Sequence, residues 1–123
     1  MTLHFELPRP LILNANQRQH WAKKAAVTRD LRALARLQAR HLPPMTRAHL
    51  VVHVGWADKR KRDVSNIEPT LKALVDGIVD AGVLEDDDDA HLVGPDLRPF
   101  VAGKHGLLVL DFDLRPLKAG EVA

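Results

Sequence analysis

Residues 62–89 read RDVSNIEPTLKALVDGIVDAGVLEDDDD, with acidic residues before and after an apolar stretch. Within it, apolar side chains recur at the helical period, at Leu71, Leu74, Val75, Ile78 and Val79. Residues 65–68 match an S-x-x-E capping box, and Gly82 is a typical residue to end a helix. We therefore predict a helix from about Asn66 to Ala81, although Pro69 favours a regular helix that starts two or three residues later.

Four segments outside this helix have the composition of β-strands. Three of them alternate apolar and polar residues, as half-buried strands do. The fourth is apolar but contains Gly94, Pro95 and Pro99, which favours a bent or edge strand. Residues 103–106 read GKHG and predict a hairpin turn between the last two strands. The predicted strands are residues 2–7, 48–57, 91–101 and 107–114.

A second helix is predicted from about Trp21 to His41, before the pair Pro43-Pro44. Its apolar arc consists of Val27, Leu31, Leu34 and Leu37. The opposite arc carries Arg29, Arg32, Arg36 and Arg40. That basic arc is either a solvated face or a face that contacts the DNA backbone. The element order predicts an α+β fold over residues 1–123, a single domain in which two helices cover a small mixed sheet, with a tail that frays from about residue 115.

The composition narrows the classes of function. The chain has 18 Lys and Arg against 16 Asp and Glu, but the acids concentrate between residues 63 and 113 and the first 62 residues are mainly basic. This asymmetry favours a polyanionic partner. The absence of cysteine excludes disulfides, thiolate metal sites and cysteine nucleophiles. No signal-peptide pattern or apolar run of about 20 residues is present, so we expect a cytoplasmic protein without a membrane partner.

The residues around the predicted helix suggest chemistry on phosphodiesters. A basic run, residues 59–62, leads directly into Asp63. Carboxylates without cysteine or paired histidine favour Mg²⁺ or Mn²⁺, which can activate water at a phosphate diester. Lys72 could neutralise the charge that develops there. Plainer interpretations are an acid that stabilises the helix N-terminus, a surface pair between Lys72 and Asp76, and a solvated acidic turn.

Taken together, these segments resemble the signature of the RusA-type Holliday junction resolvases. The matching parts are Asp63-Val64-Ser65-Asn66, Lys72-Ala73 with Asp76, Asp80-Ala81-Gly82-Val83-Leu84 and Asp86-Asp87. The segment Leu13-Asn14-Ala15-Asn16, with Arg18 and His20-Trp21, is similar to the polar segment after the first strand of that family. The resemblance implies a homodimeric, Mg²⁺-dependent endonuclease that places paired nicks in four-way DNA junctions, in a bacterial or phage-infected cell.

The resemblance also implies roles for individual residues. The catalytic residues are Asp63, Lys72 and Asp87. Asp63 and Asp87 would also bind the metal ion, and we expect Asp76 and Asp86 to complete its ligands. We expect branched DNA to be contacted by Asn14, Asn16, Arg18, His20, Lys23, Lys24, Lys59, Arg60, Lys61 and Arg62. The second acid of the family motif is absent, since Ser65 stands in its place, and the helix lysine lies three residues later than in the family. Asp76, Asp86 or Asn66 could supply the oxygen ligand that the missing acid would have provided. Asp76 is favoured, because it shares a helix flank with Lys72.

Three questions stay open at this point. A helix over residues 66–81 would be about 24 Å long, with Asp63 and Asp87 beyond its opposite ends. One chain can bring these acids together only with a shorter or bent helix, or if the run after Gly82 folds back; alternatively, two antiparallel subunits share the site. Loss of the acid at Ser65 also allows a non-catalytic protein that binds DNA junctions or single strands. A third alternative is an interaction protein whose acidic run mimics nucleic acid or binds calcium.

Overall fold

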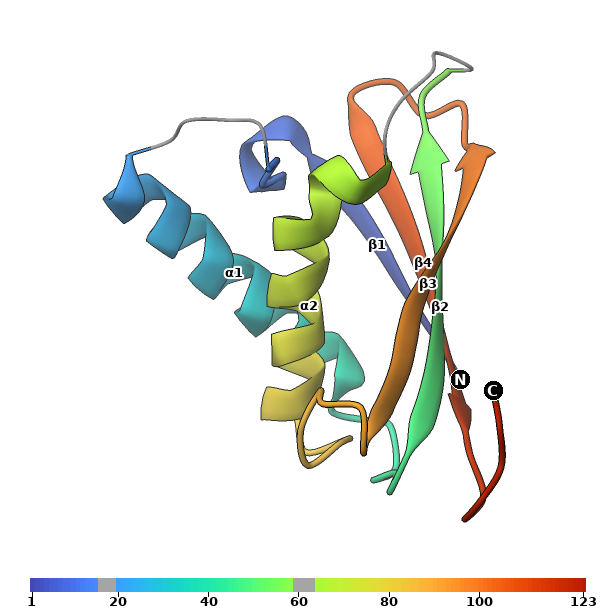
Figure 1. The fold of residues 1–123 in the computed structure, drawn as a ribbon. Helices are drawn as coiled ribbons and strands as arrows, with labels where there is room; N and C mark the ends of the chain where they lie inside the picture. Colours follow the sequence, from blue (N-terminus) through green and yellow to red (C-terminus); the bar gives the residue numbers. More distant parts are fainter. Residues whose placement is uncertain (16–19, 59–63) are drawn as a thin grey trace.

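The computed structural model describes residues 1–15, 20–58 and 64–123, and the side chains of residues 64 and 65 are outside this description. The predicted order of strands and helices and the α+β class are confirmed (Figure 1). The elements are β1 (Thr2–Pro8), α1 (Trp21–Ala39), β2 (Ala48–Trp56), α2 (Glu68–Asp80), β3 (Leu92–Val101) and β4 (Leu107–Pro116), with short 3-10 turns at Arg9–Leu11 and Val64–Ile67.

The strands of the described part form one mixed sheet in the order β1-β4-β2-β3. Strand β4 runs antiparallel to both β1 and β2, whereas β3 runs parallel to β2 at the edge. Both helices cover the same face of the sheet (Figure 1). The core lies between these two layers, and Phe5 of β1 meets Phe112 of β4 there in an edge-to-face contact with ring centroids 5.1 Å apart.

The prediction of a hairpin at residues 103–106 is wrong. The last two strands do not pair with each other, because β2 lies between β3 and β4 in the sheet. The turn instead carries the chain across the end of β2, where the amide of Ala102 donates to the carbonyl of Trp56 at 2.8 Å. Strand β4 takes the inner position because its first half is apolar on both faces: Leu108, Val109 and Leu110 are all buried.

Helix α1 packs against α2 at very short range. A Cβ atom at Gly77 would lie 2.4 Å from the carbonyl oxygen of Arg32 and 2.7 Å from Cβ of Ala35. Small residues therefore form the contact, and α1 buries Val27, Leu31, Ala35 and Ala39. The prediction that Leu37 belongs to the apolar arc is wrong, because the arc is rotated toward these alanines and leaves Leu37 55% exposed.

Two predicted ends also differ. The N-cap of α2 is Ile67, so the expected capping box does not begin this helix; the Val64–Ile67 turn precedes it, and the helix starts at Glu68, as Pro69 indicated. At the C-terminus, the prediction of a tail that frays from about residue 115 is wrong for its first residues. Strand β4 continues to Pro116, and the next residue makes ordered contacts. Leu117 is buried, and its amide donates to the carbonyl of Arg47 at 2.9 Å. None of the helices among the described residues is long and apolar enough to cross a lipid bilayer.

Candidate functional site

The loop after α2 turns back along the helix. Helix α2 ends where Gly82 adopts a φ of 83°, a left-handed conformation that favours glycine. Val83 and Leu84 then insert into the core, and the amide of Met45 donates to the carbonyl of Val83 at 2.7 Å. These contacts direct the acidic run back toward the start of the helix. Of the single-chain arrangements considered from the sequence, the structure has both the folded-back run and a shorter helix, which is 13 residues, or about 20 Å, long.

The folded-back loop brings three of the expected site residues together. Nζ of Lys72 donates to Oδ1 of Asp76 at 3.0 Å and to Oδ2 of Asp87 at 2.5 Å. Both carboxylates are three-quarters buried, whereas the lysine side chain is 61% exposed. The ammonium lowers the pKa of Asp87 below its ordinary value, mainly by its hydrogen bond. In turn, the hydrogen bonds that Lys72 donates to Asp87 and then to Asp76 raise the pKa of its ammonium above the ordinary value.

A small pocket of about 180 Å³ lies beside this cluster, between α2 and the start of β3. Lys72 and Asp87 line one side, and Gly94 and Pro95 of β3 line the other. Glu68 also lines it, one helical turn before Lys72, and was not among the residues predicted for the site. The signal was present in the sequence, because residues four apart share a helix face, but Glu68 was assigned to the capping box instead.

The acidic residues around α2 divide into separate groups. Asp86 is exposed, and its Oδ1 accepts from the amide of Asp87 at 2.7 Å. Asp88 accepts from His91 at 2.5 Å, which is the main reason why the pKa of His91 is raised. Asp80, at the end of α2, accepts two hydrogen bonds from Arg32 of α1, at 2.8 and 3.0 Å.

The pair Asp76 and Asp87 is suited to hold a cation. Both carboxylates approach the Lys72 ammonium, which occupies the position where a metal ion would neutralise them, and carboxylate oxygens are the donors that Mg²⁺ prefers. Within residues 1–15, 20–58 and 64–123, no group of three or more His, Asp or Glu is arranged to hold a metal ion. Asp63, the expected first ligand, lies outside the described residues. Of the candidates for the missing oxygen, Asp76 is the one whose carboxylate shares the Lys72 ammonium with that of Asp87.

Part of the expected DNA-contacting set is positioned near the start of α2. The hydroxyl of the buried Thr70 accepts from the amide of Leu13 and donates to its carbonyl, both at 2.7 Å. The amide of Ala15 donates to the carbonyl of Asn66 at 2.8 Å. These bonds hold Asn14 beside the N-terminal end of α2. The predicted contacts Asn16, Arg18, Lys59, Arg60, Lys61 and Arg62 lie outside the described residues.

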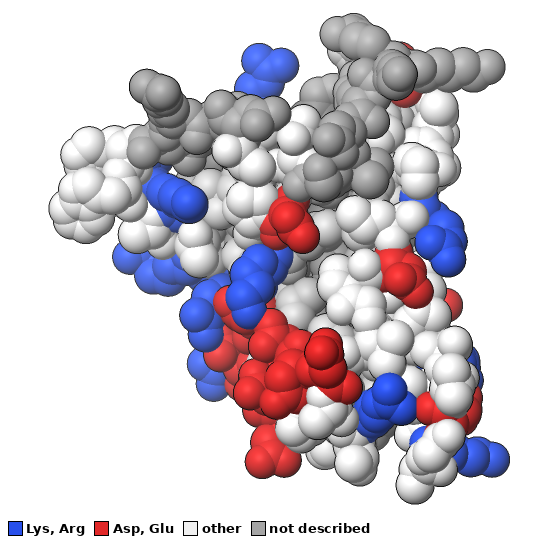
Figure 2. Space-filling view, in the orientation of Figure 1, with Lys and Arg blue, Asp and Glu red and all other residues white. Residues whose placement is uncertain are grey.

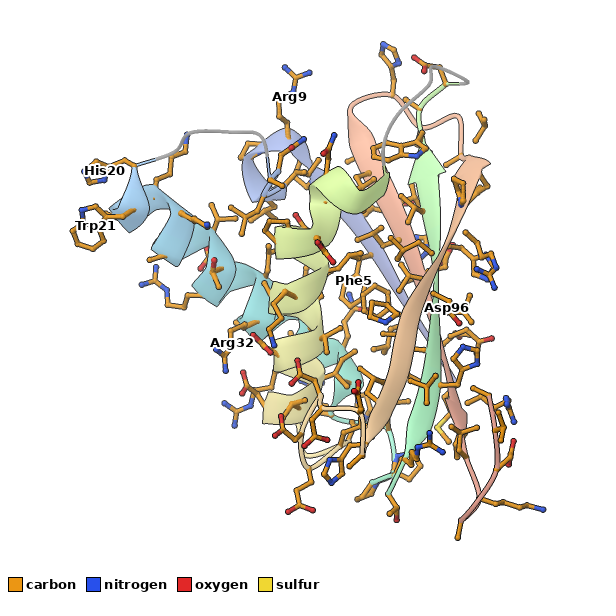
Figure 3. The ribbon with its side chains drawn as sticks, in the orientation of Figure 1. Phe5, Arg9, His20, Trp21, Arg32 and Asp96 are labelled. Carbon is orange, nitrogen blue, oxygen red and sulfur yellow. The ribbon has the colours of Figure 1, made fainter. Side chains whose placement is uncertain are left out.

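The other expected contacts lie on α1. His20 is the N-cap of this helix and accepts from the amide of Ala22 at 3.3 Å, and Lys23 and Lys24 are exposed in the first turn. Figure 3 shows His20 and Trp21 projecting from the end of α1, away from the sheet. Figure 2 shows the acids gathered over the loop that follows α2, next to Lys and Arg on the side of α1. Opposite charges thus adjoin on one surface.

Comparison with known proteins adds no family assignment. No family model matches the sequence, and no curated protein matches it.

Proposed function

We propose that the protein is a Mg²⁺-dependent, structure-selective endonuclease of the RusA type, which resolves four-way DNA junctions by paired phosphodiester nicks. Mn²⁺ could replace Mg²⁺. The observation that carries the proposal is the convergence of Asp76 and Asp87 on Lys72 within one chain. Asp87 lies 15 residues after Lys72, so the folded-back loop unites two separate parts of the sequence on which the resemblance rests.

The fold supports distinct roles for these residues. Asp76 and Asp87, with Asp63, would bind the metal ion, which when bound lowers the pKa of water and stabilises negative charge on phosphate oxygens. Lys72 would release its carboxylate partners to that ion and donate to a phosphate oxygen or to the departing oxygen of the cleaved bond. Ionised carboxylates are required for this, and the lowered pKa of Asp87 keeps it ionised at neutral pH.

The surroundings of the cluster are consistent with a DNA substrate. The segment at Asn14 is tied to the start of α2, and Lys23 and Lys24 stand exposed at the start of α1. Cations and hydrogen-bond donors of this kind bind the phosphates that flank a cleaved bond. We expect a homodimer, since paired nicks in two strands need two sites, and we expect the protein to act in the cytoplasm of a bacterial or phage-infected cell.

A non-catalytic protein that binds DNA junctions or single strands is the second candidate. The observation in its favour is that Lys72 already bonds both carboxylates, while the motif carries Ser65 in place of an acid. A hydroxyl is a much poorer Mg²⁺ ligand than a carboxylate. Such a protein would keep the basic surface and lose the reaction.

A cleavage assay separates the two candidates. The protein is incubated with a labelled four-way junction, a matching duplex and a single strand, in Mg²⁺, Mn²⁺ or EDTA. The endonuclease predicts symmetric nicks in the junction that require metal. Asp87→Asn is expected to abolish these nicks while DNA binding in EDTA persists, and Asp113→Asn, a change of the same charge on β4, is the control.

The outcomes discriminate clearly. Junction binding without nicks in either metal ion would support the non-catalytic protein. Absence of salt-sensitive binding to any of the DNAs would refute both candidates. Equal nicking by wild type and Asp87→Asn would show that the Lys72 cluster is not the catalytic site.

A further inference from the structure

The outer face of α1 forms an open groove of about 1000 Å³, separate from the Lys72 cluster. Helix α1 carries five Lys and Arg and a single Asp, so its net charge is strongly positive. The groove is lined by Trp21 at one end and by Arg36 and Arg40 at the other, with Ala25 and Ala33 between them. It therefore combines a positive rim with an apolar floor.

The arginines predicted on this arc differ in their partners. Arg32 is held by Asp80 through two hydrogen bonds and so links α1 to the end of α2. Arg29 has a carboxylate only at 3.8 Å, from Asp30, and is 77% exposed. Among the described residues, Lys24 and Arg36 form no ion pair within 4 Å. Most of the positive charge on this groove is therefore available to an external partner.

Trp21 gives the groove a second feature. Its side chain is 77% exposed, and its ring lies against that of His20 with centroids 5.6 Å apart. Figure 3 shows both rings extending into solvent beyond the first turn of α1. A large aromatic ring left exposed beside cations provides a surface on which a nucleic-acid base can stack.

We propose that this groove binds a strand of DNA, with phosphates along Arg29, Arg36 and Arg40 and an unpaired base on Trp21. From Arg29 to Arg40 the helix rises about 16 Å. One strand of a duplex advances about 3.4 Å per nucleotide, so this row spans roughly five phosphates. An unpaired base is available in a single strand or at a branch point. The groove thus gives the proposed nuclease a contact surface outside its cluster of acids.

Charge decides against a second copy of the chain as the occupant. Two α1 helices packed together about a twofold axis would bring arginines against arginines, and like charges across an interface oppose association. The cores of protein interfaces are also depleted in charge. A polyanion instead gains from every free cation in the groove. The inference rests on the proposed function only in naming DNA as the polyanion that occupies the groove. It does not require that the protein cleaves DNA.

The test is a series of DNA-binding titrations in EDTA at several salt concentrations, with a labelled junction and a labelled single strand. For Arg29→Gln/Arg36→Gln, loss of two phosphate contacts is expected to reduce the slope of log K against log salt by about 1.8 on duplex arms. At about 0.1 M salt the same relation gives a loss of affinity of roughly 60-fold on duplex arms and roughly 25-fold on a single strand. The control, Arg98→Gln/Lys118→Gln, removes two exposed charges from β3 and the tail and should leave the slope unchanged.

Trp21 is tested separately. Trp21→Ala is expected to weaken single-strand binding about 5- to 150-fold without changing the salt slope, whereas Trp21→Phe keeps a stacking surface and most of the affinity. A slope that is the same in Arg29→Gln/Arg36→Gln as in wild type would overturn the proposal, as would an equal loss in the control. The proposal would also be overturned if Arg29→Gln/Arg36→Gln differed from wild type in oligomeric state, measured by light scattering, since the groove would then bind a second copy of the chain.

Failure of this proposal differs from failure of the proposed function. Nicking of junctions with an unaltered salt slope in Arg29→Gln/Arg36→Gln overturns the groove and leaves the nuclease. A reduced slope without nicking in Mg²⁺ or Mn²⁺ supports the groove and refutes the nuclease. Absence of DNA binding by the wild type overturns both.

Discussion

Replacing Lys72 by methionine should make the stability of the protein depend on divalent cations. Methionine keeps the length and apolar stem of the side chain but removes the ammonium between Asp76 and Asp87. Because these carboxylate oxygens lie 3.0 and 2.5 Å from the same nitrogen, they can be no further apart than the sum of the two distances, 5.5 Å. Without the lysine, two negative charges would face each other across this gap.

The stability lost in Lys72→Met follows from the distance between the charged groups and from their exposure to solvent. At 5.5 Å two unit charges repel by about 0.8 kcal/mol in bulk water and by about 3 kcal/mol at an effective dielectric constant of 20. This repulsion is present in the wild type as well, where the ammonium offsets it, so the change in stability is the loss of two solvent-screened ion pairs, each worth less than about 1 kcal/mol. We expect Lys72→Met to lower the unfolding free energy by about 1 to 2 kcal/mol, or Tm by about 5 °C.

A metal ion that binds the two carboxylates should restore the unfolding free energy that Lys72→Met loses. At a concentration ten times its Kd, Mg²⁺ would return about 1.4 kcal/mol. The assay is thermal unfolding of wild type and variant in MgCl₂ and in NaCl of equal ionic strength. Lys104→Met is the matched control, because Lys104 is similarly exposed but bonds a single carboxylate, that of Glu6. The reasoning is refuted if MgCl₂ stabilises Lys72→Met no more than it stabilises Lys104→Met.

Three further outcomes can be measured on the folded chain. Gly77→Ala should lower the unfolding free energy in urea by about 1 to 2 kcal/mol, because overpacking against α1 outweighs the better helix propensity of alanine, and a more stable variant would contradict the helix contact. Thr70→Val should cost about 2 kcal/mol or more by leaving the amide and carbonyl of Leu13 without their partner, whereas Thr28→Val, at a half-exposed site, should cost much less. Asp88→Asn should lower the pKa of His91 in an NMR titration. Since the His91 pKa is raised in the folded protein, the stability lost in this variant should be greatest below pH of about 6.5 and disappear as pH rises through the folded pKa; an unchanged titration would contradict the pairing.

Local patterns in the sequence were sufficient to predict the positions of the helices and strands, but not the order of the strands in the sheet. Alternation in β1 and β2 and the helical period in α2 are properties of single segments, and they predicted these elements closely. Whether β4 pairs with β3 or inserts between β1 and β2 depends on which strand the fold buries on both faces. The consecutive apolar residues at 107–110 were the available signal for that inner position.

The rotation of α1 depended on a contact between helices. Leu37 fits the apolar arc by its own periodicity, yet α1 turns Ala35 and Ala39 toward α2 because Gly77 leaves room only for small side chains. A periodicity computed on one helix cannot contain this constraint. The same rotation leaves Leu37 exposed in the groove lined by the arginines of α1.

The candidate site was predictable as a set of residue types but not as a set of contacts. Four consecutive aspartates look equivalent in the sequence, and only the path of the loop determines that Asp87 reaches Lys72 while Asp86 accepts from the amide of Asp87. That path depends on the burial of Val83 and Leu84, two residues without chemical function. The spacing of Glu68 and Lys72 indicated a shared helix face, but the pocket that Glu68 lines also depends on how β3 approaches α2.

The fold-back also changes the argument for a dimer. A shared site between subunits was attractive because a straight helix separates residues before it from residues after it. Lys72 is the fifth residue of α2, and Asp87 bonds to it from the same chain, so the acidic loop already lies along the N-terminal half of the helix. Assembly of this cluster therefore needs no second subunit. The expectation of a homodimer then rests on the reaction, in which two nicks in opposed strands call for two complete sites related by symmetry.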